Sequence, residues 1–205
     1  MPRAQRIIIA SRNRGKVREI RNILALKDVL LQDLLDIGFR ESIEEEGESF
    51  EENALIKAET VHRWCRVPVI SDDSGLVVPY LKGEPGVRSA RYAGTGADDG
   101  KNNQLLLEKL RNARGEERRA WFACVALFYY DDGVYRTAEG RVEGIITDRP
   151  RGNNGFGYDP LFFVPHLGKT MAQLTDDEKN SISHRGAAFR GIKKYIDHYL
   201  ARVEE

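Results

Sequence analysis

The apolar residues in the first third of the chain form short runs and helical repeats. Residues 6–10 and 67–71 are short apolar runs, which predict buried strands. Apolar side chains recur at helical spacing from Val17 to about residue 26 and again over 50–65, which predicts two helices. Ser49-Phe-Glu-Glu52, at the start of the second helix, has the pattern of a capping box. A strand, a polar turn and a helix therefore open the chain, an order that directs helix N-terminal amides toward an anion.

The rest of the chain predicts longer strands. Asp131-Asp-Gly133 separates two stretches rich in apolar residues and indicates the turn of a β-hairpin. The predicted elements are, in order, a glycine-rich loop over 82–100, a helix over 102–110, hairpin strands over 120–130 and 134–147, a strand over 161–164 and an amphipathic helix from about 184. Strands and helices do not alternate regularly, so we expect a mixed α/β fold with antiparallel strands, not a Rossmann fold. Neither a linker nor an internal repeat interrupts residues 1–205, which we expect to form a single domain.

Length and composition narrow the class of protein. The chain has 205 residues, 41% of them hydrophobic and 31% charged, which suits one folded domain and excludes a disordered chain. The longest apolar run, Ala120 to Tyr130, has eleven residues, whereas about 20 are needed to cross a bilayer. The N-terminus does not resemble a signal peptide, and the two cysteines, Cys65 and Cys124, form no CxxC motif. We therefore expect a reduced, cytoplasmic protein without a membrane partner.

The net charge of zero conceals a local asymmetry. Residues 1–27 hold eight basic residues and one acid, whereas residues 28–52 hold ten acids and one basic residue. A neutral chain argues against binding nucleic acid through bulk positive charge. The two charged stretches are either solvated faces or the anion-binding and cation-binding edges of a phosphate site that uses a metal, and composition alone leaves both open.

Two segments in the first half of the chain carry candidate chemistry. Ser11-x-Asn13-x-x-Lys16 forms the turn before the first helix, where a lysine, short polar groups and helix amides suit a phosphate. It is not a Walker A loop, and an ordinary polar turn is the alternative. Asp72-Asp-Ser-Gly75 follows the strand over 67–71, so we expect it at the strand's end, where carboxylates can hold Mg²⁺ or accept a proton. Adjacent side chains of a strand point to opposite faces, so only one of the two carboxylates is expected to reach a given pocket.

Two further candidate segments lie in the second half. Gly155-Phe-Gly-Tyr-Asp-Pro160 places glycines around an aromatic residue, so Phe156 or Tyr158 could stack on a flat ligand. In Glu178-Lys-x-x-x-Ser-His-Arg185 the cationic side chains could contact phosphates or a base carbonyl, while Ser183 could simply begin a helix.

Together with two more stretches, these segments occur in the order typical of one enzyme family. The additional stretches are Ser49-Phe-Glu-Glu-Asn-Ala-x-x-Lys-Ala58 and Pro85-Gly-x-x-Ser-Ala-Arg-Tyr92. From about residue 6 to residue 195 the chain resembles the inosine/xanthosine triphosphate pyrophosphatases, house-cleaning enzymes for non-canonical purine nucleotides. The resemblance implies an elongated α/β fold with two lobes, a nucleotide cleft between the lobes and a homodimer. It also implies Mg²⁺-dependent hydrolysis of ITP, dITP or XTP between the α and β phosphates, giving the monophosphate and pyrophosphate.

The resemblance also implies roles for individual residues. Asp73 would be the catalytic residue, as base, metal ligand or both, and Glu44 the second metal ligand, although Glu45 and Glu46 leave the register open. The expected substrate-binding residues are Ser11, Asn13, Lys16, Asn53 and Lys57 at the phosphates, Phe156 against the base, Asp159, Lys179, His184 and Arg185 at the edge of the base, and the motif residues Ser74, Gly157 and Tyr158. Arg12 stands where the family usually has glycine, which makes backbone contacts in that turn uncertain.

Three other functions remain compatible with the sequence. The chain could be a pyrophosphatase for modified pyrimidine nucleotides, which a panel of triphosphates would reveal. It could be a sensor that binds a nucleotide without cleaving it, although Asp73 and the glutamates at 44–46 argue against this. It could also bind nucleic acid through its basic N-terminus, which salt-dependent binding to single-stranded DNA would reveal.

Overall fold

The computed structural model describes residues 5–203, which divide into two compact units. Unit 1 comprises the described parts of 1–73, 124–140 and 185–205, and unit 2 comprises 74–123 and 141–184. The chain passes between the units within strands and at the start of the last helix.

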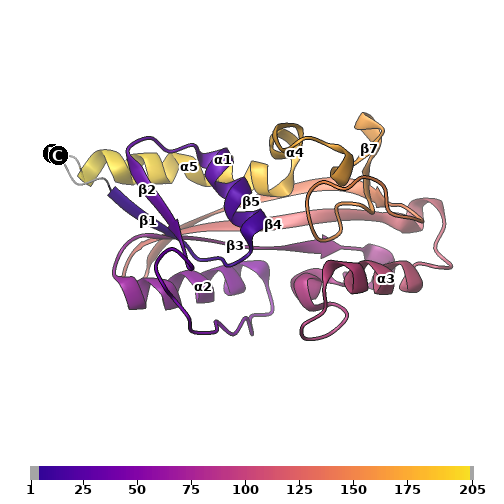
Figure 1. Ribbon diagram of the computed structural model, residues 1–205, viewed down its shortest axis with the longest axis horizontal. Helices are drawn as coiled ribbons and strands as arrows, with labels where there is room; N and C mark the ends of the chain where they lie inside the picture. Colours follow the sequence, from indigo (N-terminus) through magenta and orange to yellow (C-terminus); the bar gives the residue numbers. More distant parts are fainter. Residues whose placement is uncertain (1–4, 204–205) are drawn as a thin grey trace. The chain divides into compact units, whose positions relative to one another are not determined.

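In unit 1, helices cover both faces of a group of strands. The elements are β1 (Gln5–Ile9), α1 (Arg14–Leu24), β2 (Val29–Asp33), α2 (Phe50–Cys65), the first part of β3 (Val69–Val77), parts of β4 (Arg119–Asp131) and β5 (Val134–Ile146), and most of α5 (His184–Val203). Helices α1 and α5 lie on one face of β1 and β3, and α2 lies on the other (Figure 1). Alternating residues of β1 explain this arrangement, because Ile7 and Ile9 pack with α1 and α5 whereas Ile8 packs with α2.

Unit 2 has its own hydrophobic core. Its elements are the rest of β3, β4 and β5, the 3-10 helix Gly86–Arg91, α3 (Asp99–Lys109), β6 (Phe162–Val164), β7 (Lys169–Thr170) and α4 (Asp176–Ile182). Leu106 and Leu110, in α3 and at its C-terminal end, pack with residues of β3, β4, β5 and β6. The helix begins after Asp98, whose side chain accepts a hydrogen bond from the Lys101 amide at 2.8 Å.

The strands of the chain form one mixed sheet in the order β2-β1-β3-β4-β5-β6-β7. Strand β1 pairs with β2 and β3 in parallel, whereas β6 pairs with β5 and β7 in antiparallel orientation. The prediction of a mixed α/β fold with a sheet and flanking helices is therefore confirmed.

The structure corrects several local predictions. The strand expected over 67–71 extends through Asp72 and Asp73 to Val77, so the two carboxylates lie within β3 and not at its end. Part of the loop expected over 82–100 is a 3-10 helix, and α3 begins earlier than its apolar pattern indicates. Strands β2 and β7 and helix α4 were not predicted, because they are short and lack a distinctive apolar period. No helix among residues 5–203 is long and apolar enough to cross a membrane.

Candidate active site

Two buried carboxylates lie side by side in β3. Asp72 is 2% exposed and Asp73 is 5% exposed. As the alternation of a strand requires, they have different partners: Asp72 contacts residues of α1 and α5, and Asp73 contacts residues of α2. Burying a charge is costly unless it is paired, and both side chains are surrounded by cations or amide donors.

Asp73 is held by two residues of α2. Lys57 Nζ lies 3.1 Å from one carboxylate oxygen of Asp73, and Asn53 Nδ2 donates to the other at 3.4 Å. Lys57 also pairs with Glu45 at 2.9 Å, so one ammonium links two carboxylates. Burial raises the pKa of Asp73 more than the charges of Lys57 and Lys16 lower it. A carboxylate of this kind binds a proton more strongly than an ordinary aspartate.

Asp72 belongs to a second set of charges, in which Asp72, Glu19 and Arg185 are buried and Lys16 is partly exposed. Its Oδ2 lies 3.0 Å from Lys16 Nζ and 3.3 Å from Arg185 Nη2, and Arg185 Nη1 lies 2.6 Å from Glu19. Burial opposes ionisation of Asp72, but the charges of Lys16, Arg185 and Lys57 outweigh it and hold its pKa well below the ordinary value. In contrast to Asp73, Asp72 stays ionised as a structural counter-charge.

The turn before α1 caps that helix. Ser11 Oγ accepts from the Asn13 amide at 3.2 Å, and Asn13 Oδ1 accepts from the Lys16 amide at 3.0 Å. These two hydrogen bonds hold the turn against the first residues of α1. The side chain of Lys16 extends from there to Asp72. The structure thus brings Lys16 together with Asp72, the one of the two aspartates to which no role was assigned from the sequence.

In unit 2, a compact cluster surrounds Phe156. Asp159 Oδ2 accepts from the Phe156 amide at 2.9 Å and pairs with Lys179 Nζ at 2.5 Å, and both charged side chains are less than 5% exposed. The same Lys179 Nζ lies 4.7 Å from the centroid of the Phe156 ring. Gly155 makes this turn possible, because it has φ of +77° and a Cβ there would lie 2.1 Å from Asp159 Oδ2.

The other expected residues of unit 2 have different surroundings. Tyr158 is 4% exposed in the core, and its hydroxyl donates to the Ser89 carbonyl at 2.8 Å, so its ring is not available to stack on a ligand. His184 is 5% exposed and stacks on Phe122 at 4.8 Å. Gly157 donates its amide to Asp99, and Ser74 is half-buried in β3.

Arg185, Asn53 and Asp159, which were expected to bind the ligand, form hydrogen bonds or ion pairs with other residues of the protein. Arg185, expected at the base, is 2% exposed and bonded to Glu19 and Asp72 in unit 1. Asn53, expected at the phosphates, is fully buried beside Asp73. Asp159, expected at the edge of the base, holds the Phe156 turn and Lys179. Their predicted contacts with a nucleotide stay predictions.

The acidic run contributes one carboxylate to the surroundings of Asp73. Glu44 is exposed, whereas Glu45 is half-buried and bonds to the same Lys57 as Asp73. Among residues 5–203, no group of three or more His, Cys, Asp or Glu side chains is arranged to hold a metal ion by itself. A divalent ion here would need additional oxygen ligands from a substrate or from water.

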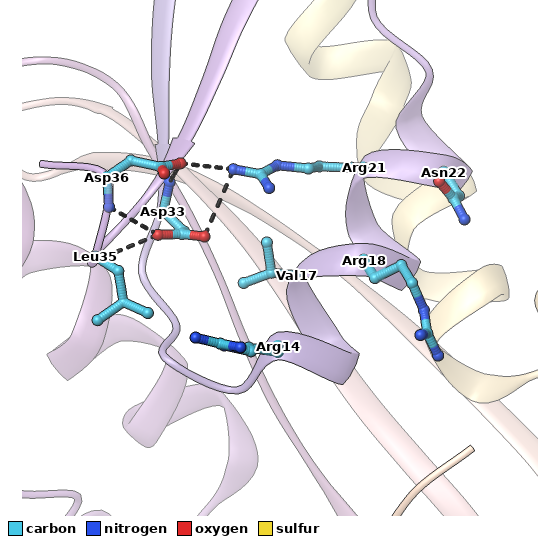
Figure 2. Close-up of a pocket in the computed structure, with 8 residues that line it drawn as sticks. All are labelled: Arg14, Val17, Arg18, Arg21, Asn22, Asp33, Leu35 and Asp36. Carbon is cyan, nitrogen blue, oxygen red and sulfur yellow. Dashed lines mark hydrogen bonds and ion pairs between the residues drawn. The ribbon is translucent and has the colours of Figure 1, made fainter. Parts of the chain in front are cut away.

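A pocket of about 500 Å³ lies beside α1, and neither Asp72 nor Asp73 lines it (Figure 2). It is lined by Arg14, Val17, Arg18, Arg21, Asn22, Asp33, Leu35 and Asp36. Figure 2 shows Arg21 bonded to Asp33 and Asp36, at 3.5 and 2.7 Å. The carboxylates in the pocket are therefore already paired with one of its arginines, and none of the predicted site residues lines it.

Sequence reasoning missed the set of charges around Asp72. Glu19 lies on the buried face of α1, together with Val17 and Ile20, and is 4% exposed. A glutamate next to an apolar face was the available signal, but its partner Arg185 is 166 residues away in the chain.

The fold and these clusters define a mixed α/β protein with a buried, cation-flanked aspartate pair and a lysine-aromatic cluster. The sequence profile of the Ham1 family matches residues 7–195, and the chain belongs to this family. A dITP/XTP pyrophosphatase of Bacillus licheniformis is 48% identical over 93% of this chain and 97% of its own length. The corresponding protein of Thermus thermophilus is also 48% identical, over 94% and 92% of the two chains.

Solved structures of relatives have the same fold. The Ham1 protein of Staphylococcus aureus superimposes with a TM-score of 0.84 at 42% identity, over 95% of this chain and 100% of that one. A HAM1 protein from Coxiella burnetii has a TM-score of 0.85 at 38% identity, over 95% and 99%. The resemblance inferred from the motifs is therefore confirmed at the level of the family.

Proposed function

We propose that this chain hydrolyses non-canonical purine nucleoside triphosphates, such as ITP, dITP and XTP, to the monophosphate and pyrophosphate, and so removes them from the nucleotide pool. The observation that carries the proposal is the buried Asp73, flanked by Lys57 and Asn53, in a chain closely similar to relatives named dITP/XTP pyrophosphatase. A nucleotide sensor needs no proton acceptor at the phosphates, whereas a buried carboxylate with a raised pKa suits one.

Unit 1 supplies groups suited to the triphosphate. A triphosphate carries about four negative charges, which repel an attacking hydroxide unless cations neutralise them. Lys16 and Lys57 would do so, and Ser11 and Asn13 would contact the phosphates from the turn before α1. Both lysines are paired with carboxylates of β3 in this structure, so binding would exchange those pairs for phosphate contacts.

Asp73 would accept the proton of the attacking water as the bond between the α and β phosphates breaks. Its raised pKa supports this role, because a general base works best when its pKa is close to the working pH. The neighbouring Asp72, with its lowered pKa, would keep Arg185 in place.

The donor set around Asp73 fits Mg²⁺. Magnesium is commonly held by one or two carboxylates together with phosphate oxygens and water. Asp73 and Glu44 would hold the ion, with the half-buried Glu45 as the alternative second ligand because it shares Lys57 with Asp73. When bound, Mg²⁺ would screen the phosphates and make the water more acidic.

Unit 2 supplies groups suited to the base. Phe156 would lie against the purine ring. Lys179, which lies beside the Phe156 ring, and His184 would donate to the carbonyl at C6 of hypoxanthine or xanthine. Adenine presents an amino donor at C6, and such a mismatch of donors can discriminate by about 10⁴. We therefore expect ITP and XTP to be strongly preferred over ATP. Rejection of GTP would depend on its 2-amino group.

The test is a Mg²⁺-dependent screen of ITP, XTP, GTP, ATP and dUTP that separates release of pyrophosphate from release of orthophosphate. Pyrophosphate release that is strongest with ITP or XTP supports the proposal. Equal kcat/KM for ATP contradicts the specificity, preference for dUTP indicates a pyrimidine enzyme, and binding without cleavage indicates a sensor.

Two properties implied by the family resemblance are part of the proposal. We propose a homodimer, which light scattering after size-exclusion chromatography would detect as twice the 23.3 kDa mass of the chain. We also propose a cytoplasmic location, which fractionation of the source cells would test.

A further inference from the structure

We propose that Arg12 is a positioning residue, which holds the acidic segment, defined here as residues 39–47, against the turn that carries Ser11 and Asn13. The inference rests on the proposed function, because the acidic segment supplies the expected second metal ligand. Arg12 itself need not contact the nucleotide or the ion.

The Arg12 side chain contacts the start of the acidic segment in three ways. Its Nη2 donates to the Phe39 carbonyl at 3.1 Å and to the Glu41 carbonyl at 2.5 Å. Its guanidinium carbon lies 5.7 Å from the centroid of the Phe39 ring. A planar guanidinium suits this combination, whereas a lysine ammonium would be a single point charge.

Phe39 connects this contact to the core. The side chain is 2% exposed and packs edge-to-face on Trp64 of α2, with ring centroids 5.5 Å apart. Of the two carbonyl groups that Arg12 binds, one belongs to this buried residue and the other to Glu41, where the segment is exposed. Arg12 thus acts where the acidic segment leaves the core.

The other end of the acidic segment is held from α2. The Gly47 amide donates to Asn53 Oδ1 at 2.8 Å, and Asn53 Nδ2 donates to the Gly47 carbonyl at 3.3 Å and to Asp73. A Cβ on Gly47 would lie 2.8 Å from Asn53 Oδ1, so the backbone approaches this amide as closely as it can. Lys57 holds Glu45 in the same way, between the two ends.

The two attachments have different consequences. Asn53 and Lys57 tie the C-terminal half of the segment directly to Asp73, whereas Arg12 ties the N-terminal half to the phosphate turn. The glutamates at 41, 44, 45 and 46 repel one another, and none of residues 40–47 belongs to a helix or strand. Without Arg12, residues 40–44 would sample more conformations, and binding a cation would have to order them again.

The expected effect is therefore on cation binding more than on the chemical step. In Arg12→Ala, we expect the Mg²⁺ concentration for half-maximal ITP hydrolysis to rise about fivefold or more, with kcat at saturating Mg²⁺ changed by about twofold at most. Arg12→Lys keeps the charge but cannot reproduce the guanidinium contacts, so it should resemble Arg12→Ala.

Arg40→Ala is the matched control. It removes the same charge from within the acidic segment but leaves both bonds from Arg12 to the carbonyl groups intact. We expect its Mg²⁺ requirement to stay within about twofold of the wild type. If Arg40→Ala reproduces the effect of Arg12→Ala, or if Arg12→Lys behaves as the wild type, charge alone accounts for the effect and the proposal is wrong.

A second readout does not depend on activity. A glutamate-specific protease should cleave after Glu41, Glu44, Glu45 or Glu46 about five times faster in Arg12→Ala than in the wild type, under conditions in which both remain folded by circular dichroism. Unchanged cleavage together with an unchanged Mg²⁺ requirement overturns the role of Arg12. If the wild type hydrolyses no triphosphate, the proposed function fails, while the cleavage rates still decide whether Arg12 holds the segment.

Discussion

At the scale of single residues, Asp72 and Asp73 are neighbours in the chain but have opposite electrostatic surroundings. Asp72 contacts two cations and has a lowered pKa, whereas burial dominates at Asp73 and raises its pKa. A lowered pKa suits a permanent counter-charge, and a raised pKa suits a group that exchanges a proton. The different duties of the two residues therefore follow from which face of β3 each side chain occupies.

Asp73→Asn tests the catalytic role. The amide keeps the shape of the side chain but cannot accept a proton, so we expect turnover of ITP to be abolished while nucleotide binding is largely retained. Pyrophosphate release and calorimetric titration would measure the two. Asp132→Asn, on the exposed turn of the β4–β5 hairpin, is the control. If Asp73→Asn turns over ITP at a rate within tenfold of the wild type, Asp73 is not the catalytic residue.

Gly155→Ala tests the Phe156 turn. The new Cβ would collide with Asp159 Oδ2, which is held by Lys179 and by the Phe156 amide, so the cluster must shift. We expect KM for ITP to rise about tenfold, in steady-state kinetics. Gly168→Ala is a matched control, because Gly168 also has a positive φ but its Cβ would meet nothing within 4 Å. Equal KM values for the two variants would show that backbone strain alone matters.

At the scale of elements, caps define where the two site-bearing helices of unit 1 begin. Asn13 caps α1, and Ser49 with Glu52 forms a complete capping box for α2. Helix α2 carries Asn53 and Lys57 on its first two turns, so the start of that helix sets the position of both residues beside Asp73. Such a cap stabilises the helix and also fixes where the site residues lie.

Ser49→Ala should lower the free energy of unfolding by about 1 kcal/mol, because the Glu52 amide loses its acceptor at 3.1 Å. Ser49→Asp, which restores an acceptor, should recover most of this loss. Urea denaturation of the wild type and the two variants measures the free energy of unfolding of each protein. Equal midpoints for Ser49→Ala and the wild type would mean that water replaces the cap without loss.

At the scale of the whole molecule, buried charges connect distant parts of the chain. Arg185 begins the C-terminal α5, Glu19 lies in α1 and Asp72 in β3, and all three meet within unit 1. Burial alone would lower the pKa of Arg185, but Asp72 and Glu19 outweigh it and raise that pKa. The cluster makes the packing of α5 on unit 1 depend on complete charge pairing.

Glu19→Ala should therefore cost about 3–5 kcal/mol of unfolding free energy, because Arg185 loses one of its two buried partners. Glu59→Ala, which removes the exposed pair with Arg63 on α2, should cost about 0.5 kcal/mol or less. Chemical denaturation at neutral pH would compare them. A loss below about 1 kcal/mol in Glu19→Ala would show that the cluster contributes little to stability.

Features that depend on residues close together in the sequence could be predicted, whereas contacts between residues far apart in the chain could not. The helix over 50–65, the hairpin around Asp131-Asp-Gly133 and the C-terminal helix follow from local periodicity and turn chemistry, and the structure confirms them. Strand β3 continues through two aspartates because distant cations compensate them, which local pattern cannot show. For the same reason Arg185 was expected at the base and was found in a buried ion pair.

By itself, the sequence determined the family and the mixed α/β class, because these depend on residue types and short spacings. Only the tertiary structure decided which aspartate is paired with which cations and that Arg12 reaches across to the acidic segment. It also showed that Asn53 and Asp159 bond to the protein itself. These outcomes depend on burial and on contacts between residues far apart in the chain, and both arise only when the sheet and its helices pack together.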